Sequence, residues 1–300
     1  MNLNPAFEEK IVNSKLNYII ICIPFFLITG PFLPDLILTI SSLYFLSCAL
    51  IYREFTLFKK FFFKIFLLFY FICVISSLFS EYKLYSLKTS LPYIRFGLFF
   101  LLVYFFFNKD KNFLRNLFFV LISCFIILII DGFYQFAFGY NLFGNPIIID
   151  RVSSFFNDEL ILGSYISRFL PLLIGLSIYT GLIFKKNYDL LSFFVFFCSM
   201  ILTFISGERT AFFFIILIYF YYLFFWQKIS KKILLVSVMS ILSIIVLLNF
   251  KSDLKNRMVD LTKTQLAPKN NETRPMELYQ GHFLIAYDLF KKNPFLGVGP

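Results

Sequence analysis

Long, unbroken apolar runs separated by short polar segments dominate the pattern along the chain. The runs do not alternate as membrane β-strands do, so each predicts a helix. Several are shorter than the roughly 20 residues of an upright span. They cover residues 17–30, 35–52, 61–80, 91–107, 116–137, 161–184, 189–206, 210–226 and 233–250. The pattern predicts an all-α polytopic membrane protein, a bundle of about nine transmembrane helices.

Composition and charge agree with this class. Hydrophobic residues make up 59% of the chain and charged residues 15%, whereas soluble domains carry about 25% charged residues. The net charge of +11 would suit nucleic acid, but basic residues gather in alternate loops and so indicate topology instead. The predicted cytoplasmic segments hold Lys10, Lys15, Arg53, Lys59, Lys60, Lys109, Lys111, Arg115, Lys185, Lys186, Lys228, Lys231 and Lys232. We therefore expect a cytoplasmic N-terminus and no nucleic-acid partner.

Two segments on the opposite side of the membrane are more than connectors, namely 138–159 and 251–300. In the second, Pro275 suits the start of a helix, and Asn293-Pro294 suits its end. Aromatic residues between them follow helical spacing. The pattern predicts a short amphipathic helix that lies on the outer membrane surface or against the bundle.

Charged residues inside or next to the apolar runs are candidates for function, because a charge at the centre of a span costs about 2.5–3.5 kcal/mol. Glu208 precedes an arginine in the turn at 206–210. Arginines near one membrane face suit a phosphate ligand. A structural alternative pairs Glu208 with Arg209, and Asp131 with Arg95 or Arg168. The candidates on the predicted outer side are Arg95, Asp131, Arg151, Arg168, Arg209, Arg274 and His282.

The sequence contains no motif typical of ATP-driven pumps, metal sites or serine hydrolases. No Walker A loop, H-E-x-x-H motif, G-x-S-x-G elbow or Cys/His cluster is present. The five cysteines lie singly in apolar runs, as small core residues do. His282, the only histidine, lies on the predicted amphipathic helix, where a structural or surface role is the commoner one. We expect no metal and no cofactor.

Three stretches carry a family resemblance. The first joins DGFYQ at 131–135, RVSSFFNDE at 151–159 and GSY at 163–165. The second is SGERTA at 206–211, and the third runs from Arg274 to NPFLGVGP at 293–300. In their order and predicted topology, these stretches resemble the O-antigen ligase and polymerase family of bacterial envelope enzymes.

The resemblance implies a fold and a reaction. Such proteins have roughly a dozen membrane helices and one large periplasmic loop. They act in lipopolysaccharide or polysaccharide biosynthesis at the bacterial inner membrane, where they transfer a glycan from undecaprenyl diphosphate to an acceptor hydroxyl, with inversion and without a metal. The acceptor is lipid A-core sugar in ligases and another glycan repeat in polymerases. Residues 1–188 would then form an N-terminal bundle, and 189–300 part of the ligase-related domain.

The resemblance also implies residue roles. Arg209 and Arg274 match the arginines that would hold the lipid diphosphate, and Arg95, Arg151 and Arg168 are possible further substrate contacts. The family's proposed catalytic base is a histidine beyond the GVG motif, which would lie past residue 300; His282 precedes that motif. We therefore expect the N-terminal portion of a longer enzyme, without an assigned catalytic residue and without turnover by residues 1–300 alone.

Two other classes stay open. A flippase or transporter of lipid-linked glycans would also need an outer arginine cluster, but it would need charged contacts in the cytoplasmic half as well. A regulatory membrane protein, or an inactive fragment that only binds the lipid donor, would show no transfer. Arginine-dependent binding of undecaprenyl diphosphate separates a donor-binding protein from one without a ligand site.

Overall fold

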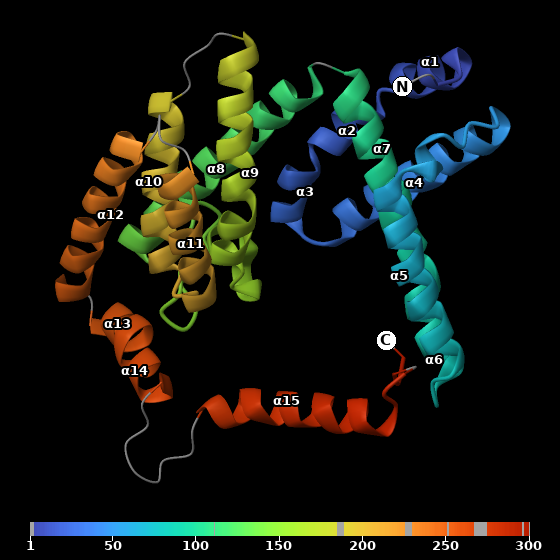
Figure 1. Ribbon diagram of the computed structural model, residues 1–300. Helices are drawn as coiled ribbons and strands as arrows, with labels where there is room; N and C mark the ends of the chain where they lie inside the picture. The colour runs from blue at the N-terminus through green and yellow to red at the C-terminus, as the bar shows by residue number, and fades with distance from the viewer. Residues whose placement is uncertain are drawn as a thin grey trace. The chain divides into compact units, whose positions relative to one another are not determined.

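The computed structural model describes residues 3–110, 112–184, 189–225, 230–250, 252–266, 275–295 and 297–299 (Figure 1). The chain divides into two compact units. Unit 1 comprises Met1–Ile23, Pro31–Phe113 and Asn271–Pro300, and unit 2 comprises Pro24–Gly30 and Leu114–Asn270. The described residues are helical apart from turns, loops and two isolated β-bridges, so the predicted all-α class is confirmed for them.

Unit 1 is built on two pairs of packed helices, α4 with α7 and α5 with α6. Phe45 of α4 and Phe105 of α7 are fully buried, and both contact the ring of Phe7 on α1 edge-on. This aromatic cluster joins the N-terminal helix to the α4–α7 pair. The helices of unit 1 are α1 (Pro5–Asn13), α2 (Leu16–Ile21), α4 (Phe32–Ile51), α5 (Phe61–Leu78), α6 (Lys83–Ser90), α7 (Ile94–Lys109) and α15 (Pro275–Lys292).

Unit 2 packs α9, α10, α11 and α12 against one another. Gly132 allows α8 to approach α10 closely, because a Cβ there would lie 2.6 Å from Leu202 Cδ1. The helices that belong to this unit are α3 (Ile23–Thr29), α8 (Phe113–Phe138), α9 (Leu162–Phe184), α10 (Asp189–Ile205), α11 (Arg209–Phe225), α12 (Ser230–Phe250), α13 (Ser252–Lys255) and α14 (Leu261–Leu266).

Several helices of the described chain are long and apolar enough to cross a membrane. Five single helical stretches meet that test: Phe32–Ile51, Phe61–Leu78, Lys83–Lys109, Phe113–Phe138 and Leu162–Gly181. The sharply bent pair Ser237–Asn249 and Ser252–Lys263 would make a sixth span, and Phe193–Ile205 and Arg209–Tyr222 are shorter apolar helices. The chain is thus a helical membrane protein with several spans, and the count of nine stays a prediction.

The first predicted span, 17–30, is not one helix. It breaks at Cys22 into α2 and α3. Pro24 gives the reason, since proline has no N–H and its ring clashes with the carbonyl four residues earlier. The break predicted at the next turn is present, with Gly30 at a φ of 132° and α4 starting at Phe32.

The C-terminal segment contains the predicted helix. α15 begins at Pro275 and ends at Lys292, directly before Asn293-Pro294. Its apolar residues Phe283, Tyr287 and Phe290 are exposed. The helix itself is confirmed, whereas its place on a membrane surface stays a prediction. So does the division of the chain at residue 188, which rests on the family resemblance.

Candidate functional site

The loop between α8 and α9 is held in place by buried polar side chains of α8 and of the loop itself. Gln135 Oε1 accepts hydrogen bonds from the backbone N–H groups of Ser153 and Ser154 at 3.0 and 2.7 Å. Asn141 Nδ2 donates to the Ser154 carbonyl oxygen at 3.0 Å. These side chains satisfy backbone groups that would otherwise be buried without partners. The loop is therefore an ordered element rather than a simple connector.

Asp131 belongs to the same network. It is fully buried, and its two carboxylate oxygens accept from Leu142 N at 2.9 Å and from Ser154 Oγ at 2.6 Å. Both partners are neutral donors, in place of the arginine pairing that the sequence suggested. Asp131 thus orders the loop, and its burial leaves no surface for a substrate.

The turn from α10 into α11 makes contacts on two sides. Gly207 lies at a φ of 69°, a conformation that glycine adopts without strain. Glu208 reaches the N-terminus of α9, where its carboxylate accepts from Gly163 N at 2.6 Å and from Ser164 N at 3.0 Å. A carboxylate at this position satisfies free N–H groups and complements the helix dipole. The turn is therefore fixed by α9.

Arg151 anchors the loop to this turn. Its Nε donates to the Ser206 carbonyl oxygen at 3.0 Å, and one Nη donates to the Leu160 carbonyl oxygen at 2.8 Å. The same guanidinium lies 3.7 Å from a Glu208 carboxylate oxygen. The ion pair expected for Glu208 with Arg209 thus gives way to one with Arg151, 57 positions before it in the chain.

Arg257 is the residue that sequence reasoning missed. It follows α13, and its Nε donates to the Gly207 carbonyl oxygen at 3.1 Å. A Cβ at Gly207 would lie 2.7 Å from that Nε and 3.5 Å from Arg151 Cγ, so the two arginines flank the glycine. The charge of Arg257 is repelled by those of Arg151 and Arg209 and attracted by those of Asp150 and Glu208. The only sequence signal was its place in the charged stretch after the last apolar run.

Arg209 completes what we call the arginine cluster, namely Arg151, Arg209 and Arg257. It is the first residue of α11 and is half-buried, and one Nη lies 3.4 Å from Thr262 Oγ1. The N-terminus of α11, the positive end of its dipole, is at the same turn. Arg151 and Arg257 therefore contact the turn to which Arg209 belongs.

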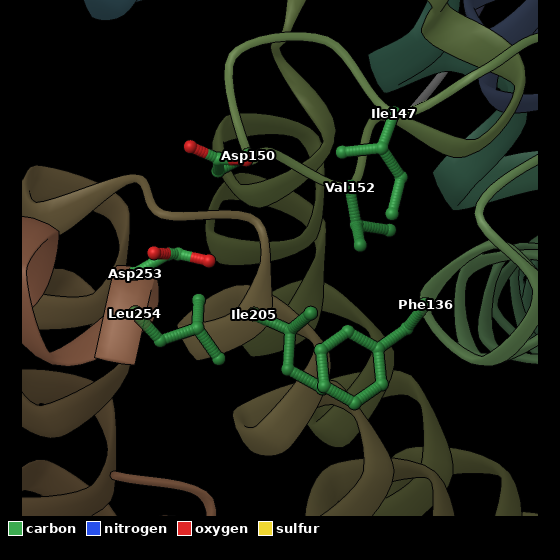
Figure 2. Close-up of a pocket in the computed structure, with 7 residues that line it drawn as sticks. All are labelled: Phe136, Ile147, Asp150, Val152, Ile205, Asp253 and Leu254. Atoms are coloured by element: carbon green, nitrogen blue, oxygen red, sulfur yellow. The ribbon is translucent and has the colours of Figure 1, made fainter. Parts of the chain in front are cut away.

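A pocket of about 80 Å³ lies within the same unit (Figure 2). Its apolar lining comes from α8, the α8–α9 loop, the end of α10 and α13, and two carboxyl groups, those of Asp150 and Asp253, also line it. In Figure 2 the two carboxyl groups lie on the same side of the pocket, across from Phe136. The seven lining residues are Phe136, Ile147, Asp150, Val152, Ile205, Asp253 and Leu254.

The remaining predicted residues belong to unit 1, to the exposed surface of α9 or to the part of the chain that is not described. Arg95 forms a two-pronged ion pair with Asp35 in unit 1, with Nη2 at 2.7 Å and Nη1 at 2.9 Å from its carboxylate oxygens. Arg168 is exposed on α9, and His282 is exposed on α15. Arg274 lies outside the described residues. The structure therefore brings together Arg151 and Arg209 of the predicted set and adds Arg257.

No family model, curated protein or solved structure matches the chain. The apolar helices define a multi-pass membrane protein.

Proposed function

We propose that the arginine cluster binds the diphosphate of an undecaprenyl-linked glycan, and that the protein serves the transfer of this glycan to an acceptor hydroxyl. The observation that carries the proposal is that Arg151 and Arg257 flank Gly207, in the same turn as Arg209. The motifs at 131–165, 206–211 and 293–300 point to the same reaction through their resemblance to O-antigen ligases and polymerases.

The chemistry of the cluster fits a diphosphate. A guanidinium stays charged and carries five N–H donors. The hydrogen bond from Arg257 Nε to the Gly207 carbonyl oxygen uses one of these donors and fixes the side chain. The N–H groups on the two Nη atoms of Arg257 remain for a ligand. Charge-assisted bonds to phosphate oxygens are about twice as strong as neutral ones. A fixed group of guanidiniums loses little entropy when it binds such an anion.

The proposed topology places this cluster where a lipid-linked donor presents its headgroup. With a cytoplasmic N-terminus and about nine spans, the turn at 206–210 and the segment after α12 both lie on the periplasmic side of a bacterial inner membrane. The undecaprenyl chain would stay in the bilayer while its diphosphate meets the arginines.

In the proposed reaction, the acceptor oxygen attacks C1 of the first sugar and the bond from C1 to the diphosphate oxygen breaks. The diphosphate leaves with the bonding electrons, and the hydroxyl proton passes to a base. The arginines stabilise the charge that develops on the leaving group, the effect that an oxyanion hole provides in acyl transfer. The family resemblance implies a histidine as this base and a reaction without a metal.

A ligand series tests the donor site. The purified chain is placed in lipid nanodiscs, and its affinity is measured for undecaprenyl diphosphate, undecaprenyl monophosphate and undecaprenol. The proposal predicts an affinity that falls in that order, with a loss of about ten-fold or more for each phosphate removed. Equal affinity for the three lipids would show that the headgroup is not recognised and would overturn the proposal.

A further inference from the structure

The pocket and the arginine cluster are built from the same three segments of the chain. Asp150 lines the pocket and Arg151, the next residue, belongs to the cluster. Ile205 lines the pocket directly before the turn that Arg151 and Arg257 contact. On the third segment, the pocket residues 253 and 254 lie one helical turn before Arg257. Whatever binds at the arginines is therefore adjacent to the pocket.

The arginine cluster and the pocket should bind different chemical groups. Carboxylates only accept hydrogen bonds when ionised, so Asp150 and Asp253 favour hydroxyl or amide N–H groups and repel phosphate. The apolar lining, including Phe136, Val152 and Leu254, suits C–H surface. A ligand that combines several hydroxyls with an apolar ring face is a sugar. The pocket volume of about 80 Å³ is several times the roughly 10–15 Å³ that a cavity needs to hold one water molecule, so the pocket can admit a larger polar group.

The position of Asp150 is held by its surroundings. Ile149 and Asp150 both have positive φ values, 49° and 55°. A β-bridge between Ile148 and Arg151 closes this turn, and the Arg151 side chain ties it to the Ser206 carbonyl oxygen. Backbone strain of this kind persists where neighbouring contacts fix it, and it recurs at ligand sites.

We propose that this pocket holds the sugar next to the diphosphate of the donor, with Asp150 and Asp253 accepting hydrogen bonds from its hydroxyl or amide groups. The inference rests on the proposed function, because the arginine cluster supplies the diphosphate end. The arginines would then bind the diphosphate, and the two carboxylates would bind the sugar next to it.

The test compares two lipids that differ only in the sugar, undecaprenyl diphosphate and undecaprenyl diphosphate N-acetylglucosamine. Affinities are measured in nanodiscs with EDTA present, for the wild type and for the double variant Asp150→Asn, Asp253→Asn. Asparagine tolerates the positive φ at position 150, so the loop should be preserved. The control is Asp158→Asn, at an exposed carboxylate of the same loop that does not line the pocket.

We expect the wild type and the control to bind the sugar-bearing lipid more tightly. The double variant should lose about ten-fold or more of the preference for that lipid over undecaprenyl diphosphate. It should bind undecaprenyl diphosphate at least as tightly as the wild type, because two charges that repel phosphate are removed. Binding of both lipids without a preference in the wild type would overturn this inference alone. A preference that the double variant retains would also overturn it. No binding of either lipid would overturn the proposed function and this inference with it.

Discussion

Glu208 and Ser164 are joined by two hydrogen bonds that run through one carboxylate oxygen. Glu208 Oε2 accepts from the backbone N–H of Ser164 at 3.0 Å and from its hydroxyl at 2.6 Å. These residues lie 44 positions apart, on the turn before α11 and in the first turn of α9. The contact fixes the turn that begins at Ser206 and presents Arg209, so the position of the arginine cluster depends on it.

Replacing Glu208 by Gln should loosen this turn. The amide keeps one acceptor oxygen, but it loses the charge that attracts Arg151 and the N-terminus of α9. Because the Glu208 side chain is only 11% exposed, we expect a loss of about 1–3 kcal/mol in the free energy of unfolding. Thermal unfolding in detergent measures it. The control Glu159→Gln, at an exposed position, should leave the melting temperature unchanged, and equal melting temperatures for all three proteins would contradict the role of Glu208.

Replacing Asp131 by Leu should release the α8–α9 loop. Leucine has a similar size but no acceptor, so the Leu142 N–H and the Ser154 hydroxyl lose the oxygens that accept from them. A buried donor without an acceptor costs about 1–3 kcal/mol. Hydrogen exchange of the amides at 139–154 should become faster in the variant. If those amides exchange as in the wild type, Asp131 does not hold the loop.

The helices could be predicted well from the sequence because each depends on the residues of its own segment. Each apolar run has too few polar groups to fold outside lipid, and proline and glycine mark many of the breaks, as at Gly30-Pro31. The exception at Cys22 has the same kind of cause, since Pro24 lies inside the run that was predicted as one span. For α15, the flanking prolines at 275 and 294 predicted both ends closely.

The site was predicted less completely because its contacts join distant segments. Arg209 stood out as a charge in a turn between apolar runs, but Arg257 meets that turn only after the chain has passed through α11 and α12. The sequence suggested that Glu208 pairs with its neighbour Arg209. In the fold, Glu208 accepts hydrogen bonds from free N–H groups of α9 and forms an ion pair with Arg151. Such contacts follow from tertiary packing, which a local pattern does not contain.

The GVG segment should detach from unit 1 when Gly299 is replaced by Ala. Gly299 has a φ of 87°, and a Cβ there would lie 2.6 Å from Ser86 Oγ and 2.9 Å from Ser80 Cβ. Its N–H also donates to Ser76 Oγ at 3.2 Å. Spin labels at the exposed residues Tyr82 and Phe295, in a background without native cysteines, should give a broader distance distribution in the variant.

The control for this experiment is Gly281→Ala. Gly281 lies in α15, and a Cβ there would meet nothing within 4 Å. Alanine is favoured over glycine in a helix by about 1 kcal/mol, so the label distance should stay narrow. Broadening in both variants, or in neither, would show that close packing at Gly299 does not hold the segment.

Arg95 should act on stability rather than on ligand binding. It joins α7 to α4 through Asp35 and also donates to Thr39 Oγ1 at 2.8 Å. Because the Asp35 side chain is about half exposed, a double-mutant cycle of Asp35→Asn and Arg95→Gln should give a coupling energy of about 0.2–1 kcal/mol. Affinity for undecaprenyl diphosphate should not change. A weaker affinity with unchanged stability would instead make Arg95 a substrate contact.

The affinity of arginine variants for undecaprenyl diphosphate tests the central claim most directly. The wild type is compared in nanodiscs with Arg209→Gln, Arg257→Gln, Arg257→Lys and the control Lys83→Gln, at an exposed residue on the same predicted side, and melting temperatures are measured alongside. We expect Arg209→Gln and Arg257→Gln to bind about ten-fold or more weakly, and Lys83→Gln to bind as the wild type does. Arg257→Lys should recover part of the loss because it keeps the charge. Equal affinity for all of these proteins would contradict a diphosphate site at the arginine cluster.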